Sequence, residues 1–155
     1  MPWFIGASAL SLCAWFIVFG AVVSPRIEHL GRSERLSLLL APQCFRHISI
    51  LLLMPGFTAE TIPPHWVMGT IGGDVVTAIL AMVTILLLRR NHPHAYKLAW
   101  LATIVGTADL LRNVIYAMYL EVPSHMLIAA AIPTMGVPLM LVAHIYALRV
   151  LTEGQ

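Results

Sequence analysis

"LSLLLAPQCFRHISILLLM", residues 36–54, decides the fold, because the number of membrane-spanning helices depends on whether this stretch crosses the bilayer. Both of its ends are apolar, but its centre contains Pro42, Gln43, Arg46 and His47. On hydropathy alone such a stretch could be a re-entrant or interfacial segment, which would leave four spans instead of five. The remainder of the sequence has to decide between the two counts.

The composition predicts an integral membrane protein. Of 155 residues, 59% are hydrophobic and only 10% are charged, and the mean hydropathy is +0.86, which is more apolar than a soluble domain needs for one core. The length leaves room for one transmembrane bundle over residues 1–155 and for no soluble domain beside it. The net charge of +2 is interpreted as a topology signal, so no nucleic-acid partner is inferred. The two cysteines lack a CxxC spacing and predict no metal site.

The basic residues favour five spans. Apolar runs extend over about residues 3–23, 36–54, 66–88, 95–120 and 126–148. The basic residues outside the apolar interiors are Arg26, Arg32, Arg35, Arg89, Arg90, Lys97 and Arg149. If all five runs cross, these seven share one side, and the loops "PGFTAETIPPH" and "EVPSH" on the other side contain no lysine or arginine. The positive-inside rule then predicts an all-α, multi-pass bundle of a bacterial-type inner cell membrane, with the N-terminus outside and the C-terminus inside.

The first run could instead be a cleaved signal peptide. It lacks a basic segment at its start, and it is longer than the hydrophobic region typical of such peptides. We therefore interpret it as a membrane span.

Four ionisable residues fall inside the predicted spans: Arg46, Asp74, Asp109 and Arg112. An unpaired charge near the bilayer centre costs about 2.5–3.5 kcal/mol, and a folded protein is stable by only about 10 kcal/mol. The four must therefore pair with one another or face water. At about 1.5 Å of rise per residue, Asp74 reaches the depth of Arg46, so these two are the expected interhelical pair. Asp109 and Arg112, three residues apart, can pair along one helix.

Polar residues recur at α-helical spacing on three of the predicted helices, which indicates one polar face on each. These stripes are Gln43, Arg46 and His47 on the second helix, Thr70, Asp74 and Thr77 on the third, and Asp109, Arg112, Asn113 and Tyr116 on the fourth. The fifth span contains Pro133, Gly136 and Pro138, which predict a kinked helix, followed by His144. We expect a buried polar pocket lined by Gln43, Arg46, His47, Asp74, Asp109, Arg112, Asn113 and His144. The glycines of "GTIGGD" are interpreted as helix packing contacts.

Such a pocket predicts a site for a hydrophobic small molecule such as a lipid, an isoprenoid or a quinone. A carboxylic acid and a histidine could isomerise or cyclise such a molecule by moving protons. The candidate catalytic residues are Asp74 and Asp109 as acids and His47 and His144 as bases. The candidate binding residues are Gln43, Arg46, Arg112, Asn113 and Tyr116. An arginine near each aspartate also fits a purely structural or orienting role, so enzyme and binder both stay open.

Other functions fit the same residues. The polar faces could join helices in an accessory or structural subunit of a larger membrane complex, or they could form a proton or solute pathway. His47 and His144 could ligate a haem, although the neighbouring charges disfavour it, and His65 with His125 is a weak candidate for a metal site. No cofactor is predicted. The expected partners are membrane lipids, the hydrophobic small molecule, and a second copy of the chain or a larger membrane complex.

The segments "FRHISILLLMPGF", "GDVVTAILAM", "GTADLL" and "IPTMGVPLMLVAHIYAL" resemble a family of small bacterial membrane proteins of uncharacterised function. The shared pattern is a phenylalanine-arginine pair with a proline-glycine exit, a glycine-aspartate, a later glycine-x-x-aspartate, and a closing run with two prolines and a histidine. The resemblance covers roughly residues 43–148. It selects Arg46, Asp74, Asp109, Pro133, Pro138 and His144. It implies no activity.

Overall fold

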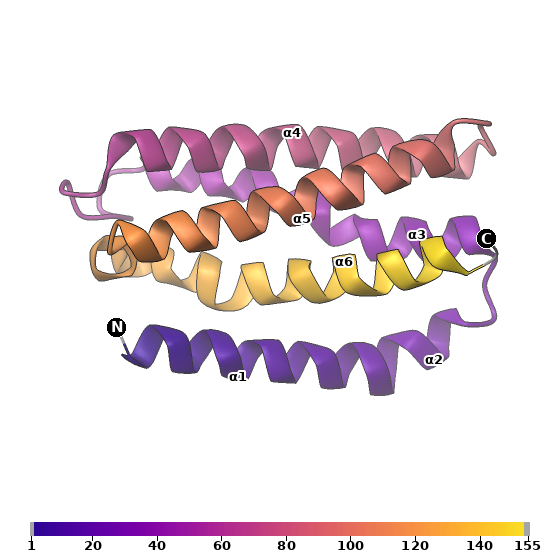
Figure 1. Ribbon diagram of the computed structural model, residues 1–155, viewed down its shortest axis with the longest axis horizontal. Coiled ribbons are helices and arrows are strands. Elements are labelled where there is room, and N and C mark those ends of the chain that lie inside the picture. The colour runs from indigo at the N-terminus through magenta and orange to yellow at the C-terminus, as the bar shows by residue number, and fades with distance from the viewer. Residues whose placement is uncertain (1, 154–155) are drawn as a thin grey trace.

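The computed structural model describes residues 2–153, which form helices and short connections without a β-strand. Five long helical segments run back and forth along one axis (Figure 1). They are Pro2–Ile27, Arg32–Leu53, Pro64–Arg89, Ala95–Tyr119 and Leu127–Thr152. Each is long enough and apolar enough to cross a membrane. The predictions of an all-helical chain and of five such helices are confirmed, and the second segment, which was in doubt, is one of them.

Three of the five segments change helix type along their length. The first comprises α1 (Pro2–Val18), the π-helix η1 (Phe19–Val23) and α2 (Ser24–Ile27), and the second comprises α3 (Arg32–Leu40) and the 3₁₀-helix η2 (Ala41–Leu53). The third and fourth are α4 (Pro64–Arg89) and α5 (Ala95–Tyr119). A short 3₁₀ turn η3 (Val122–His125) leads to the last segment, which comprises the 3₁₀ turn η4 (Leu127–Ala130), the π-helix η5 (Ile132–Gly136) and α6 (Val137–Thr152). The predicted irregularity at Pro133 and Pro138 is thus a π-helix that leads into α6.

Two hydrophobic clusters lie toward opposite ends of the bundle. The Leu40 cluster, near the C-terminus, includes Leu36, Leu39, Leu40, Leu88, Ala99, Val142, Ala147 and Leu151. The Trp66 cluster, near the opposite end, includes Leu52, Ile62, Trp66, Val67, Val122, Met126 and Ala129. Most of the buried charged and amide side chains lie between the two clusters. Apolar packing therefore flanks the polar site on both sides along the bundle.

The first helix is less buried than the other four, which form the core of the bundle. In Figure 1, α1 runs beside α6 and lies apart from α4, and its principal contacts are with α6 and η5. Phe4 is its one buried side chain and joins the Trp66 cluster. Toward its other end, Leu12 and Trp15 pack against the Leu40 cluster. Helix α1 is thus held at two places, with its middle lying across the space between them.

The second segment is a 3₁₀-helix for thirteen residues, whereas 3₁₀ runs longer than three or four residues are uncommon. It begins beside Pro42, which has no N–H for an α-helical bond and whose ring clashes with the carbonyl four residues earlier. The three-residue repeat places Gln43, Arg46, Ser49 and Leu52 on the buried side. His47 is exposed, and its Nδ1 is 2.8 Å from the carbonyl oxygen of Cys44. The predicted stripe, which assumed α-helical spacing, is therefore wrong at His47.

The 3₁₀ winding also compensates for a short segment. A 3₁₀ residue rises about 2.0 Å and an α-helical residue about 1.5 Å. The 22 residues of Arg32–Leu53, thirteen of them 3₁₀, therefore extend about 40 Å. The 26 residues of α4 extend about 39 Å as a regular α-helix. The two neighbours thus have matched lengths despite different residue counts.

The outward position of His47 gives a direct test of this register. We expect His47→Leu to change the free energy of unfolding by no more than about 0.5 kcal/mol. The His47 side chain is exposed, so its removal leaves no buried group without a partner. Gln43→Leu, four residues earlier, should cost about 1–3 kcal/mol, because it removes the hydrogen bond from the fully buried Gln43 side chain to the carbonyl oxygen of Met140. Thermal unfolding of both variants in the same detergent measures the difference. A larger loss for His47→Leu would contradict the 3₁₀ register.

Candidate functional site

Arg46 is the centre of a buried ion cluster, formed with Asp74 and Asp109, that joins three helices. Its side chain extends from η2 toward Asp74 on α4 and Asp109 on α5, and only 1% of the residue is exposed. Nε donates to Oδ1 of Asp74 at 2.7 Å, and Nη2 lies 2.6 Å from the same oxygen. Nη2 also donates to Oδ2 of Asp109, and Nη1 donates to the carbonyl oxygen of Gly106 at 2.9 Å. All three guanidinium nitrogens are thus bonded to the protein.

The predicted pairing of Arg46 with Asp74 is present, but the structure adds Asp109 to it. The expected partner of Asp109, Arg112, is its more distant cation: Nη1 lies 3.9 Å from Oδ1, and the Arg112 side chain is 57% exposed. Asn113 donates to Oδ2 of Asp109 at 3.2 Å. The three-residue spacing correctly identified Arg112 as a neighbour of Asp109 on the same helix. It could not show that the 3₁₀-helix brings Arg46 within reach of both carboxylates.

Glycines of α4 leave room for the charged side chains of α5. A Cβ on Gly73 would lie 1.9 Å from Oδ1 of Asp109, and a Cβ on Gly69 would lie 3.0 Å from Nη2 of Arg112. A Cβ on Gly72, on the exposed side of the helix, would meet nothing within 4 Å. The glycines of "GTIGGD" were predicted to be packing contacts. At Gly69 and Gly73 the packed groups are a guanidinium and a carboxylate rather than a helix backbone.

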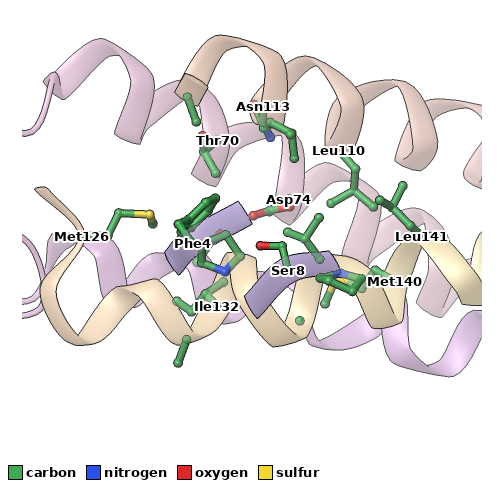
Figure 2. Close-up of a pocket in the computed structure, with 18 of the residues that line it drawn as sticks. Phe4, Ser8, Thr70, Asp74, Leu110, Asn113, Met126, Ile132, Met140 and Leu141 are labelled. Carbon is green, nitrogen blue, oxygen red and sulfur yellow. The ribbon is translucent and has the colours of Figure 1, made fainter. Parts of the chain in front are cut away.

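A cavity of about 650 Å³ lies beside this ion cluster, between α1 and the four core helices. Its polar lining residues are Ser8, Arg46, Ser49, Thr70, Asp74 and Asn113. Most of its wall is apolar, with contributions that include Phe4, Leu52, Trp66, Leu110, Ala117, Met126, Ile132, Met140 and Leu141. Figure 2 shows Asp74 from α4 and Ser8 from α1 projecting toward the same space. The cavity is thus an apolar chamber with a single group of polar side chains.

One protein-family model covers nearly the whole chain. It is described as a domain of unknown function (DUF8737), and it matches residues 3–152. The chain belongs to this family. No curated protein and no solved structure matches it. The predicted membership of an uncharacterised family is confirmed at that level, while the specific residue pattern and the bacterial origin stay predictions.

In this DUF8737 chain, the predicted site residues separate into three groups. Arg46, Asp74 and Asn113 line the cavity. Asp109 and Arg112 do not line the cavity. Asp109 belongs to the ion cluster, and Arg112 is its second cationic neighbour. The third group lies outside the cavity wall and does not contact the carboxylates of the ion cluster. It comprises Gln43, His47, Tyr116 and His144.

Two of the residues outside the cavity support its wall from behind. Gln43 is fully buried and donates from Nε2 to the carbonyl oxygen of Met140 at 3.0 Å, so it links η2 to α6. His144 is 1% exposed and packs against Gly106, where an added Cβ would lie 2.6 Å from Nε2. Within residues 2–153 neither ring nitrogen of His144 has a hydrogen-bond partner. Gly106 thus lets His144 lie directly behind the carbonyl that Arg46 binds.

The histidine arrangements considered from the sequence are not formed. His47 faces out of the bundle while His144 is buried inside it, so the two rings do not share a space that a haem could fill. Near the loops, Nδ1 of His125 is 2.8 Å from the Thr61 hydroxyl, and the ring of His65 packs on Tyr116. Over the described residues 2–153, no group of three His, Cys, Asp or Glu side chains is arranged to hold a metal ion.

The sequence reasoning included Thr70 in a polar stripe but missed the two serines of the cavity, Ser8 and Ser49. A signal for Ser8 was present in the first helical segment. Residues of this segment that face the bundle or the cavity recur every three or four positions: Phe4, Ser8, Leu12, Trp15 and Phe19. Ser8 is the one polar member of this stripe, and it falls in the middle. A serine at the centre of an apolar helix face indicates a polar group opposite it.

Proposed function

We propose that this multi-pass membrane protein binds a hydrophobic small molecule in the cavity between α1 and the four core helices. The observation that carries the proposal is a space of about 650 Å³ whose wall is apolar except for one polar group of side chains. Small-molecule sites typically enclose about 300–1,000 Å³, with mostly apolar walls and a few polar groups that fix orientation. A purely structural subunit has no use for such a space, because the side chains around it lose packing contacts.

The position of the cavity supports a ligand that arrives from the bilayer. The apolar Leu40 and Trp66 clusters lie toward the two ends of the bundle, which disfavours entry of water-soluble molecules along its axis. On its outer side the cavity is bounded by α1, of which Phe4 is the only buried residue. A lipid-soluble molecule would reach the cavity sideways, past this helix.

The charge distribution supports an orientation in a cell membrane. The turn between α2 and α3, the turn between α4 and α5, and the C-terminal end lie together in Figure 1, opposite the N-terminus. These turns and the helix ends beside them contain the seven basic residues outside the polar core. The positive-inside rule places that end in the cytoplasm and the N-terminus outside.

The geometry favours binding over proton transfer as the function of the site. Acid/base catalysis requires an acid and a base within hydrogen-bonding reach of the same molecule. Of the four candidate catalytic residues, only Asp74 lines the cavity, and its Oδ1 is bound by Arg46. Asp74 is therefore better placed to bind a polar group than to exchange protons with His47 or His144.

A cavity-filling substitution tests the proposal. A Cβ on Gly136, which lines the cavity, meets nothing within 4 Å, so Gly136→Phe should place its ring in the empty space. Gly72→Phe is the matched control, because Gly72 is equally unobstructed but lies outside the cavity wall. In native mass spectrometry, we expect the wild type and Gly72→Phe to carry a bound small molecule that Gly136→Phe has lost. Equal bound mass in all three proteins, or none in any after gentle extraction, would overturn the proposal.

A further inference from the structure

We infer that the cavity selects an amphiphile whose polar end is an uncharged hydroxyl group, held between Asp74 and the hydroxyls of Ser8 and Thr70. This inference rests on the proposed function and narrows its ligand class. Three features of the site carry it: hydroxyl side chains without partners, a carboxylate oxygen without a hydrogen bond from the protein, and a guanidinium whose charge is shared by two carboxylates.

The first feature is a set of buried hydroxyl groups for which the protein provides no hydrogen-bond partner. The side-chain oxygens of Ser8, Ser49 and Thr70 are buried and have no hydrogen-bond partner within residues 2–153. A ligand would reach them after rotation about χ1. Ser49 is 1% exposed and Thr70 is 8% exposed, and all three residues line the cavity. A buried hydroxyl without a partner costs about 1–3 kcal/mol. Three of them around one chamber indicate a polar group that is supplied from outside the chain.

The second feature is the orientation of Asp74. Its Oδ1 accepts both contacts from Arg46, at 2.7 and 2.6 Å. The structure shows no hydrogen bond from a donor in residues 2–153 to Oδ2 of Asp74. Arg46 therefore acts as a positioning residue that leaves one oxygen of Asp74 available at the cavity wall. A ligand O–H could donate to this oxygen and accept from a serine or threonine hydroxyl.

The third feature disfavours an anionic ligand. Two carboxyl groups, Asp74 and Asp109, share the one buried guanidinium, whose three nitrogens are all bonded. A sulfonate, phosphate or carboxylate would be repelled by Asp74, and the positive charge of Arg46 is already shared by the two carboxylates. Burying a charge without a partner is far more costly than burying a neutral group that forms hydrogen bonds.

A cationic ligand is also disfavoured. An ammonium group at Oδ2 of Asp74 would lie beside the guanidinium of Arg46, so two cations would compete for one carboxylate. Asp109 cannot compensate, because it already has Arg46, Asn113 and, at 3.9 Å, Arg112 around it. An ammonium ion would also lose its strong hydration on entering the cavity. A neutral hydroxyl avoids both costs, and the apolar remainder of the wall accommodates a hydrocarbon tail.

Three probes with one tail and different head groups test the inference. They are 12-bromododecan-1-ol, 12-bromododecane-1-sulfonate and 12-bromododecan-1-amine, added to the full chain in nanodiscs of phosphatidylcholine at neutral pH. Bromine quenches tryptophan fluorescence on contact, and Trp66 is the tryptophan that lines the cavity. Quenching that is lost in the Gly136→Phe variant measures occupancy of the cavity itself. We expect the alcohol to occupy the cavity at a concentration at least tenfold lower than either charged probe requires.

A second variant connects the preference to the hydroxyl groups. Thr70→Val keeps the shape of the side chain and removes only its hydroxyl. It should weaken binding of the alcohol about fivefold, the effect of one hydrogen bond, and should leave binding of the sulfonate unchanged. An equal loss for both probes would indicate a change in packing and would overturn the role given to Thr70.

The outcomes separate this inference from the proposed function. If the sulfonate or the amine binds as tightly as the alcohol, or more tightly, the head-group inference is wrong while the ligand-binding function stands. If none of the three probes gives quenching that Gly136→Phe removes, both proposals fail together.

Discussion

Replacement of Arg46 with methionine is expected to prevent most of the protein from folding stably. Methionine is similar in length and apolar, so the packing of η2 changes little, but Asp74 and Asp109 lose the guanidinium that they share. Removing one partner from a buried ion pair typically costs about 3–5 kcal/mol, which is a large part of a total stability of about 5–15 kcal/mol. We expect a low yield of monodisperse protein and a thermal unfolding transition at least 10 °C below that of the wild type.

Two controls show whether the loss arises from unpaired charge. Arg112→Met removes the exposed member of the cluster, whose Nη1 is 3.9 Å from Asp109, and should cost less than about 1 kcal/mol. The triple variant Arg46→Met, Asp74→Asn, Asp109→Asn removes all three charges and should recover at least half of the lost stability, because no unpaired charge remains buried. A triple variant as unstable as Arg46→Met alone would contradict the electrostatic explanation.

Substitution of Gly73 with alanine is expected to have the second largest effect. The added Cβ would lie 1.9 Å from Oδ1 and 2.5 Å from Cγ of Asp109, so the carboxylate has to move away from α4. This movement would pull it off Arg46, which binds its other oxygen. Overpacking of a tight contact costs about 1–3 kcal/mol, and the weakened ion pair adds to that cost. We therefore expect Gly73→Ala to lower the free energy of unfolding by about 3 kcal/mol.

Gly72→Ala is the matched control for this prediction. It introduces the same methyl group one residue earlier in the same helix, where the Cβ meets nothing within 4 Å. It should stabilise the protein slightly, since alanine is favoured over glycine in a helix by about 0.5–1 kcal/mol. Thermal unfolding of both variants in one detergent makes the comparison. Equal effects of the two substitutions would show that Asp109 does not pack against α4.

The helical architecture followed from the sequence because it depends on hydropathy and charge, which are properties of composition. The five apolar runs and the separation of basic from non-basic loops were sufficient to count the helices, including the doubtful segment with Arg46 at its centre. The pairing of Arg46 with Asp74 also followed, since depth in a helix is proportional to residue number.

The residues that line the cavity could not be predicted from the sequence, because they depend on the helix type and on which helices are neighbours. Spacing by 3.6 residues grouped His47 with Arg46, whereas the 3₁₀ winding groups Ser49 with Arg46. His144 was expected to line the pocket but lies behind Gly106 rather than in the chamber. Ser8 was missed because α1 is apolar and holds no charged residue. Charge identified the structural centre of the site, whereas the hydroxyl groups around the chamber have a weaker sequence signal.

In the membrane orientation proposed above, the long 3₁₀ segment would give the ion cluster a second role, in fixing the thickness of bilayer that the second span matches. Rewinding thirteen residues from 3₁₀ to α would shorten the span by about 6 Å. It would also turn Leu52 about 180° relative to Gln43, because the two helix types differ by about 20° of rotation per residue. The three bonded nitrogens of Arg46 hold the middle of this segment against such a turn. Release of Arg46 would therefore leave the span free to contract, and the surrounding lipid would have to thin or the helix ends would have to sink.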